Sequence, residues 1–193
     1  MINKHMNHFK TNYLLETIEV KKKRIMIIMR GYPGSGKSYA ANELAKKFNA
    51  VICSADDFFM KSGKYVFDAS KLGLAHKTCQ EKAYNTMVDG KNLIIDNTNL
   101  KSKDCEFYVD MVSESNEFTN NEYAVSVITP AYNNIETAIN HRKNQDDGKN
   151  IPEDKMRLMD KTMKENDVEF ELKNKFKDVK FIKESDIDTW LHK

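Results

Sequence analysis

One short segment of the sequence combines glycines, a lysine and a serine at a spacing that suits phosphate binding. Residues 31–38 read Gly-Tyr-Pro-Gly-Ser-Gly-Lys-Ser and match the pattern G-x-x-x-x-G-K-[ST] in full. Glycines let the backbone curl so that several N–H groups point at one anion, and a following helix presents its positive end there. We therefore expect ATP or GTP phosphates to be held by Gly31, Pro33, Gly34, Ser35, Gly36, Lys37 and Ser38.

Two of these side chains and one aspartate further along the chain predict a phosphate and metal site. Lys37 is expected to reach the β- and γ-phosphates, and the Ser38 hydroxyl is expected to bind Mg²⁺. Asp96 ends an apolar run, which places its carboxylate at the carboxyl edge of a buried strand, beside the glycine-rich loop. A carboxylate there is the expected second ligand of Mg²⁺. A nucleoside triphosphate, ATP or GTP, and Mg²⁺ are therefore the predicted cofactors.

A pair of aspartates, Asp56 and Asp57, follows the second predicted strand. Phosphoryl transfer to a hydroxyl benefits from a carboxylate that accepts the hydroxyl proton and aligns the oxygen for in-line attack. We assign this role to Asp56. Asp57 is expected to cap a following helix, and it joins Asn97 and Asn99 as a candidate substrate contact. The two asparagines either form a turn or supply polar contacts in the site.

The segment 141–152 joins two predicted helices and contains several basic residues and a glycine. In kinases with a glycine-rich phosphate loop, such a segment closes over ATP as a lid and brings an arginine to the transferring phosphate. Arg142 is the candidate for that arginine, and it is catalytic in this interpretation together with Lys37 and Asp56. An ordinary surface helix-turn-helix is the alternative.

Strands alternate with helices along the chain, which predicts an α/β fold with a parallel sheet and helices on both faces. The apolar runs predict strands at 25–29, 51–53, 91–96, 123–129 and 179–182. Helices are expected at 37–48, 70–88, 103–113, 134–143 and 153–166, with a short helix from Ser185 to Leu191. Residues 54–68 are expected to be irregular, with a turn at Gly63.

Length and composition favour one intracellular domain. The 193 residues suit a polar extension over 1–23 and a single P-loop kinase domain over 24–193. The net charge of +2 argues neither for nor against an anionic partner. The three cysteines form no C-x-x-C pair, which argues against a disulfide framework, and no run of 18 apolar residues predicts a membrane span. A cytoplasmic or otherwise intracellular location is expected, without a membrane partner.

Several blocks occur in one order and together resemble a known family. They are the glycine-rich segment, Ser-Ala-Asp-Asp-Phe-Phe (54–59), Gly-Lys-Tyr-Val-Phe-Asp (63–68), Ala-His-Lys-Thr-Cys-Gln (75–80) and Ile-Ile-Asp-Asn-Thr-Asn (94–99). The chain resembles the polynucleotide-kinase-like P-loop kinase family over about residues 25–165, particularly the kinase domain of NEDD4-binding protein 2 and its short relatives. The resemblance implies a P-loop NTPase/kinase fold with a five-stranded parallel sheet, a small helical lid, and Asp56 as general base.

The chain departs from this family pattern at three positions. Where the phage member of the family has arginines beside its aspartate pair, this chain has Ala55 and Phe59. A second lid arginine reads Asp146, and the sequence leaves open whether Lys143, Lys149 or Arg157 replaces it.

The resemblance implies transfer of the γ-phosphate of ATP to the 5′-hydroxyl end of RNA or DNA. The departures favour, as an alternative, a small-molecule or nucleotide hydroxyl as the acceptor. A nucleotide-binding module without transfer activity is the third hypothesis.

Overall fold

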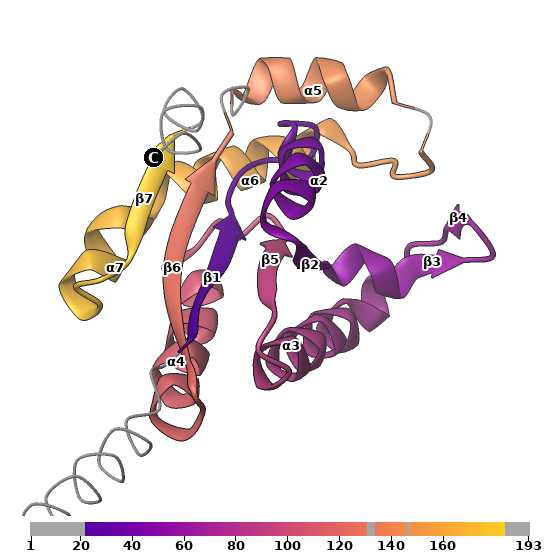
Figure 1. Ribbon diagram of the computed structural model, residues 1–193. Coiled ribbons are helices and arrows are strands. Elements are labelled where there is room, and N and C mark those ends of the chain that lie inside the picture. Colours follow the sequence, from indigo (N-terminus) through magenta and orange to yellow (C-terminus); the bar gives the residue numbers. More distant parts are fainter. Residues whose placement is uncertain (1–21, 131–133, 146, 184–193) are drawn as a thin grey trace, which may run out of the picture.

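The computed structural model describes residues 22–130, 134–145 and 147–183. Its main sheet is built from β1 (Lys22–Met29), β2 (Ala50–Cys53), β5 (Asn92–Asp96), β6 (Asn121–Thr129) and β7 (Lys180–Lys183) (Figure 1). The strands lie in the order β2-β5-β1-β6-β7, and every neighbouring pair is parallel. The predicted five-stranded parallel sheet is confirmed.

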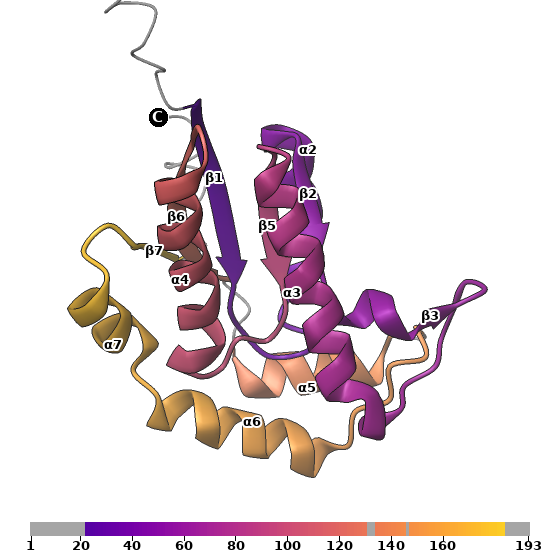
Figure 2. The ribbon, with the colours of Figure 1, turned by 90° about the horizontal axis from the view of Figure 1, so that it is seen from below.

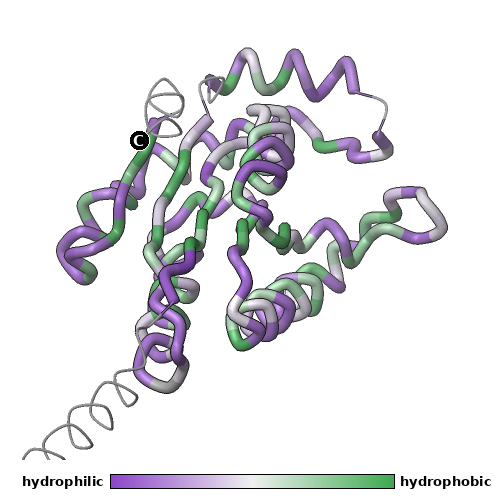
Figure 3. The backbone as a smooth tube through the Cα atoms, viewed as in Figure 1, coloured by the Kyte–Doolittle hydropathy of each residue, from purple (hydrophilic) through white to green (hydrophobic). Residues whose placement is uncertain are grey.

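The central strand β1 explains why its sequence is a continuous apolar run. Residues 26–29 of β1 are fully buried, and the strand pairs with β5 on one side and β6 on the other. A strand covered on both faces has no solvent side, so polar residues do not alternate with apolar ones. Figure 3 shows hydrophobic residues concentrated along these central strands.

Helices cover both faces of the sheet, as expected (Figures 1 and 2). On one face α2 (Lys37–Phe48) packs Ala41 and Leu44 against Ile27 and Ile94 of the sheet. The larger cluster on the other face contains residues of α3 (Leu72–Val88), α4 (Ser102–Phe118) and α7 (Val168–Lys175). The chain therefore forms a three-layer α/β domain.

Two further helices, α5 (Ile135–Lys143) and α6 (Glu153–Glu165), lie across the carboxyl ends of the strands (Figure 2). They share a third apolar cluster with the loops at that edge, which contains Tyr32, Leu100, Ala138, Ile139 and Met156. This pair matches the expected helical lid, and its apolar cluster fixes it above the glycine-rich loop.

The segment that follows β2 is more regular than expected. It forms a 3₁₀ helix η1 (Ala55–Phe59), a hairpin of β3 (Met60–Lys61) and β4 (Lys64–Tyr65), and a second 3₁₀ helix η2 (Ala69–Lys71). Ser62 and Gly63 connect the hairpin with φ angles of 49° and 79°. Positive φ at both central residues is the turn geometry that suits a two-residue hairpin, and glycine adopts it without strain.

The remaining observations on the fold concern the helices, the cysteines and the bounds of the described residues. The helix α7 was not predicted, and α4 runs to Phe118, beyond the expected end at Ser113. Cys53, Cys79 and Cys105 are buried and free. Across the described residues, no helix combines the length and apolar character needed to cross a membrane. Strand β1 begins at Lys22, and residues 1–21, together with the helix expected from Ser185, lie outside the described residues.

Candidate active site

The glycine-rich segment forms a tight loop between β1 and α2. The Gly31 amide donates to the carbonyl of Thr98 at 3.0 Å, and the Ser35 amide donates to the carbonyl of Tyr32 at 3.2 Å. Gly36 precedes α2 with φ 87°, a backbone conformation that residues other than glycine rarely adopt. The loop therefore has the strand, turn and helix context that phosphate binding requires.

Gly34 is the point at which this loop meets the lid. Its φ is 81°, and a Cβ built on it would lie 2.5 Å from the carbonyl oxygen of Ala138 in α5. The carbonyl of Gly34 lies 3.2 Å from Nδ1 of His141 on the same helix. A side chain at position 34 would push the lid away from the loop, so glycine is needed both for the turn and for this contact.

Lys37 is buried at the start of α2, and its Nζ donates to the carbonyl of Tyr32 at 2.6 Å. Burial lowers the pKa of Lys37 to about 8; the negative charges of Asp96 and Asp56 oppose this shift, and the positive charges of Lys149 and Arg142 add to it. Four charged side chains from separate parts of the chain thus act on one ammonium group. The structure gathers the predicted phosphate lysine, metal aspartate, base and lid arginine into one electrostatic site.

Asp96 ends β5 in register with Met29, the last residue of β1 before the glycine-rich loop. Burial raises the pKa of Asp96, while a hydrogen bond with Ser38 and the charge of Lys37 oppose the shift. Its Oδ1 is buried and has no hydrogen-bond partner among the described residues. An acceptor oxygen without a donor, beside a hydroxyl, is the donor set that a hard cation such as Mg²⁺ uses. The residues present therefore fit the predicted metal.

Asp56 stands in η1, whose first residues are held by Ser54. The Ser54 hydroxyl accepts from the Asp56 amide at 3.3 Å and donates to the carbonyl of Asp96 at 2.9 Å, which joins η1 to the end of β5. The two carboxylate oxygens of Asp56 have different partners. Tyr65 donates its hydroxyl to Oδ1 at 2.9 Å, and Lys149 donates to Oδ2 at 2.6 Å. Asp56 is therefore oriented from both sides.

Asp57 does not cap the helix, contrary to the prediction, because Ser54 occupies the capping position of η1. The Asp57 carboxylate instead accepts from Nζ of Lys82 on α3 at 2.9 Å, and both side chains are substantially exposed. A capping residue must precede the helix that it caps, and Asp57 lies inside the five-residue η1.

Asn97 and Asn99 have backbone partners that explain their presence. Oδ1 of Asn97 accepts from the Ala55 amide at 2.9 Å and so secures η1. Asn99 is buried with φ 45°, and its Nδ2 donates to the carbonyl of Met29 at 2.7 Å. Asparagine tolerates left-handed backbone better than most residues. Of the two interpretations left open by the sequence, these contacts support the turn-forming one for Asn99.

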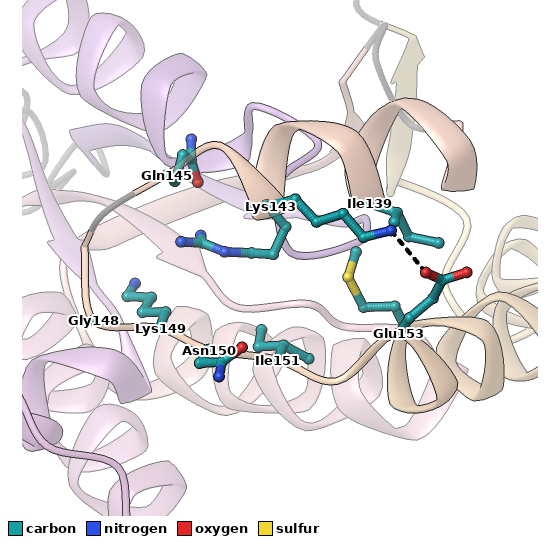
Figure 4. Close-up of a pocket in the computed structure, with 10 residues that line it drawn as sticks. Ile139, Lys143, Gln145, Gly148, Lys149, Asn150, Ile151 and Glu153 are labelled. Atoms are coloured by element: carbon teal, nitrogen blue, oxygen red, sulfur yellow. Dashed lines mark hydrogen bonds and ion pairs between the residues drawn. The ribbon is translucent and has the colours of Figure 1, made fainter.

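The lid carries two positive side chains toward the site. Arg142, on α5, is buried, and it donates through Nη2 to Asp147, while its Nε has no hydrogen-bond partner among the described residues. Lys149 lies in the loop between α5 and α6, with 26% of its side chain exposed. Both residues line a pocket of about 330 Å³ that lies between this loop and the lid helices (Figure 4). The predicted lid arginine thus has a lysine beside it.

The structure separates the three basic residues that the sequence left open. Lys143 forms an ion pair with Glu153 at 2.9 Å and turns toward it, away from Lys149 (Figure 4). Arg157 binds Glu136 and Glu153 on the outer surface of the lid. Among the three, only Lys149 contacts Asp56. Asp146 lies outside the described residues.

Two side chains of the site were missed by reasoning from the sequence. Tyr65 binds Asp56, and Asp147 binds Arg142. Tyr65 belongs to the Gly-Lys-Tyr-Val-Phe-Asp block (63–68), so the signal was present, but the block indicated a family and no role. Asp147 lies in the run Gln-Asp-Asp-Gly (145–148), where a turn is the ordinary interpretation.

Comparison with known proteins identifies a family that matches the part of the chain containing the site, and a relative that is similar to part of the chain. The family model described as AAA domain (AAA_33) matches residues 26–166, which include every site residue described above. Human NEDD4-binding protein 2 is 40% identical over 87 residues, which are 44% of this chain and 5% of that protein. The chain thus spans a small part of this relative. The resemblance predicted from the motif blocks is confirmed.

Several solved structures, two of them described as kinases, share the fold. A chain of the Pnkp1/Rnl/Hen1 RNA repair complex has a TM-score of 0.59 at 20% identity, over 78% of this chain and 46% of that chain. A putative kinase from Chloroflexus aurantiacus has a TM-score of 0.56 at 12% identity, over 88% and 97%. A sugar kinase from Janibacter has a TM-score of 0.56 at 15% identity, over 88% and 95%. The expected P-loop kinase fold is confirmed.

Proposed function

Because this chain belongs to the AAA domain family and has a P-loop kinase fold, we propose that it transfers the γ-phosphate of ATP to the 5′-hydroxyl end of RNA or DNA. The observation that carries the proposal is the position of Asp56. Its carboxylate binds the lid through Lys149 and acts electrostatically on Lys37 of the phosphate loop. The candidate base therefore interacts both with the phosphate-binding loop and with the lid, a kind of element that closes over substrates in kinases.

In this mechanism the acceptor hydroxyl lies beside Asp56. The carboxylate takes the hydroxyl proton as the new oxygen–phosphorus bond forms, and the bond between the γ-phosphorus and the bridging oxygen of ADP breaks. The Tyr65 hydroxyl keeps Oδ1 of Asp56 in place, so Oδ2 is the oxygen that faces the acceptor once Lys149 has left it. Asp56 thus orients the attacking oxygen as well as accepting its proton.

Positive side chains provide the remaining stabilisation. Lys37 exchanges the Tyr32 carbonyl for phosphate oxygens, and Arg142 and Lys149 bring the charge of the lid to the transferring group. Ser38 and Asp96 are the side chains that would hold Mg²⁺, which neutralises charge on the phosphates when bound. The buried setting of Lys37 and Asp96 strengthens these interactions, because little water screens them.

A small hydroxylated molecule or a nucleotide is the alternative acceptor, and one observation favours it. Ala55 and Phe59, which stand where the phage member of the family has arginines, are 5% and 2% exposed. They belong to the apolar core and offer no charge to a polynucleotide. The fold does not separate the two acceptors, since a chain of an RNA repair complex and a sugar kinase both share it, with TM-scores of 0.59 and 0.56.

The test is transfer of labelled γ-phosphate from ATP, with Mg²⁺, to 5′-hydroxyl RNA and DNA oligonucleotides. Asp56→Asn is expected to lower transfer by about 10²- to 10⁴-fold, the usual contribution of a general base, while ATP still binds. Asp89→Asn is the matched control, because Asp89 is an exposed carboxylate that also pairs with a lysine, Lys91. Lys37→Ala serves as the inactive reference.

Three results would change the proposal. Full transfer by Asp56→Asn would remove Asp56 from the mechanism. Transfer to sugars or nucleosides, with none to oligonucleotides, would establish the alternative acceptor class. Saturable ATP binding without transfer to any hydroxyl would bring forward the third hypothesis, a nucleotide-binding module.

A further inference from the structure

The hairpin of β3 and β4 and the residues just after it present aromatic rings at the surface beside the candidate base. Phe67 is 54% exposed, and its ring lies parallel to that of Tyr65, with an interplanar angle of 8° and 6.5 Å between centroids. Large apolar side chains that remain exposed next to a polar site often mark a binding surface. Figure 3 shows hydrophobic residues at the base of the hairpin and hydrophilic ones toward its tip.

The exposed Phe67 ring and the half-buried Tyr65 ring both pack against a buried ring. The buried ring of Phe59 lies 5.0 Å from Phe67 and 5.9 Å from Tyr65, and the Val66 amide donates to the Phe59 carbonyl at 2.9 Å. A ring fixed before its ligand arrives loses little conformational freedom on binding. Phe67 is thus a pre-positioned aromatic surface.

The aromatic pair is connected to the reaction centre by direct contacts. Tyr65 donates its hydroxyl to Asp56, and Nζ of Lys149 lies 5.1 Å from the centroid of the Tyr65 ring. The backbone of Gly148 also approaches Tyr65, since a Cβ on Gly148 would lie 3.4 Å from the Tyr65 carbonyl oxygen. Asp56, Tyr65 and Phe67 therefore follow one another along the surface. A molecule whose hydroxyl reaches Asp56 can extend past Tyr65 to Phe67.

Positive charge accompanies the aromatic rings. Lys61 and Lys64 face each other across the hairpin and are exposed, and neither forms an ion pair with another described residue. Aromatic rings beside unpaired lysines are the combination that binds single-stranded nucleic acid, because bases stack on the rings while phosphates follow the positive charge. A sugar acceptor would instead need hydrogen-bonding side chains around its hydroxyls.

We infer that the β3–β4 hairpin and the residues just after it form the platform for the acceptor strand, with the 5′-terminal base stacked on Phe67 and the strand phosphates beside Lys61 and Lys64. The inference rests on the proposed function and adds to it the residues that recognise a polynucleotide. It also offers a replacement for the charge that Ala55 and Phe59 do not supply.

The experiment measures kcat/KM for transfer to single-stranded 5′-hydroxyl RNA, using oligonucleotides whose 5′-terminal residue is ordinary or abasic. Phe67→Ala is expected to lower kcat/KM about tenfold with the ordinary end, as stacking of one base is worth about that much, and Phe67→Trp is expected to retain it. With the abasic end, Phe67→Ala should have no further effect. Phe170→Ala, which removes a 64% exposed ring from α7, is the matched control.

The lysines have their own readout. The double variant Lys61→Ala, Lys64→Ala should reduce the slope of log affinity against log salt by about 1.4, since each phosphate contact on a single strand contributes about 0.7. Binding is measured by fluorescence anisotropy of a labelled 5′-hydroxyl RNA in the presence of ADP and Mg²⁺.

Several outcomes would overturn the inference. Equal losses for ordinary and abasic ends would show that Phe67 acts through the fold and does not stack on a base. If the protein transfers phosphate to RNA efficiently and Phe67→Ala leaves this transfer unchanged, the platform is rejected. The proposed kinase activity would stand. Absence of transfer to any oligonucleotide would reject the nucleic-acid acceptor and the platform together.

Discussion

The two halves of the candidate active site are built differently. The phosphate half contains the buried Lys37 and Asp96, whose Oδ1 is buried, and it is held by strand register and backbone turns between β1, β5 and α2. The acceptor half, around Asp56, is more exposed and is held by side chains, one from the hairpin and one from the lid loop. Backbone contacts therefore dominate the first half, and side-chain contacts dominate the second.

In the proposed reaction, this difference separates phosphate binding, which is common to all acceptors, from recognition of one acceptor. Every kinase with this loop needs the same grip on the same phosphates, so the buried half serves any acceptor. The exposed half meets the hydroxyl that is to be phosphorylated. Substitutions in the first half should therefore abolish transfer to all acceptors, whereas those in the second should change which acceptor is used or how fast it reacts.

The largest effect that sharpens this comparison is expected at Lys149. Lys149→Ala should lower kcat about 10²-fold, because a positive group aimed at the transferring phosphate typically contributes this much. Lys143→Ala is the matched control from the same lid and should change kcat by less than about threefold, since its pair with Glu153 is exposed.

Lys149→Arg, which keeps the charge, should recover part of the activity. The ATP-dependent transfer assay under saturating substrate measures all three variants. If Lys143→Ala and Lys149→Ala lost the same activity, the lid would act as a whole, and the proposed role of Lys149 would be abandoned.

A smaller effect, on stability, is expected at Asn99, which binds the turn after β5 to the end of β1. Asn99→Ala should lower the free energy of unfolding by about 2 kcal/mol, because the buried Met29 carbonyl loses its donor and alanine is strained at positive φ. Asn99→Gly removes the same hydrogen bond without the backbone strain and should lower it less.

Urea unfolding monitored by circular dichroism gives these values. Below the unfolding range, transfer by Asn99→Gly should stay close to that of the unaltered protein. A large loss of kcat in a folded Asn99→Gly protein would instead assign Asn99 to the substrate, as one interpretation of the sequence had it.

The smallest expected effect is the uptake of a proton by Lys37 when ATP binds. With a pKa of about 8, Lys37 is neutral in about 10% of molecules at pH 7 and about 90% at pH 9, and bound phosphates favour its charged form. ATP binding should therefore take up about 0.1 proton at pH 7 and about 0.9 at pH 9. The rate of phosphate transfer should fall as the pH rises through 8.

Calorimetry of ATP binding in buffers of different ionisation enthalpy measures the uptake. Lys37→Arg, which stays charged across this range, should abolish it. Uptake that did not rise between pH 7 and pH 9 would show that the buried Lys37 stays protonated.

Much of the fold could be predicted because its signals are local. A strand buried on both faces must be a continuous apolar run, and the runs around β1 and β5 show this clearly. The helix α7 escaped prediction because only Val168 and Leu172 of its eight residues are buried, which leaves too weak a period to recognise. The strands of the hairpin have two residues each, too short for any alternation to appear.

The amino-acid sequence alone determined which residues make up the phosphate half, because a glycine-rich loop and its lysine and serine are contiguous, and Asp96 ends a recognisable strand. The acceptor half depends on contacts between residues far apart in the chain. Asp56 and Lys149 are 93 residues apart, and nothing in their local sequences distinguishes Lys149 from Lys143 or Arg157. Only the packing of the lid over the ends of the strands decided which lysine reaches Asp56, the candidate base, because side-chain ion pairs depend on distance in space.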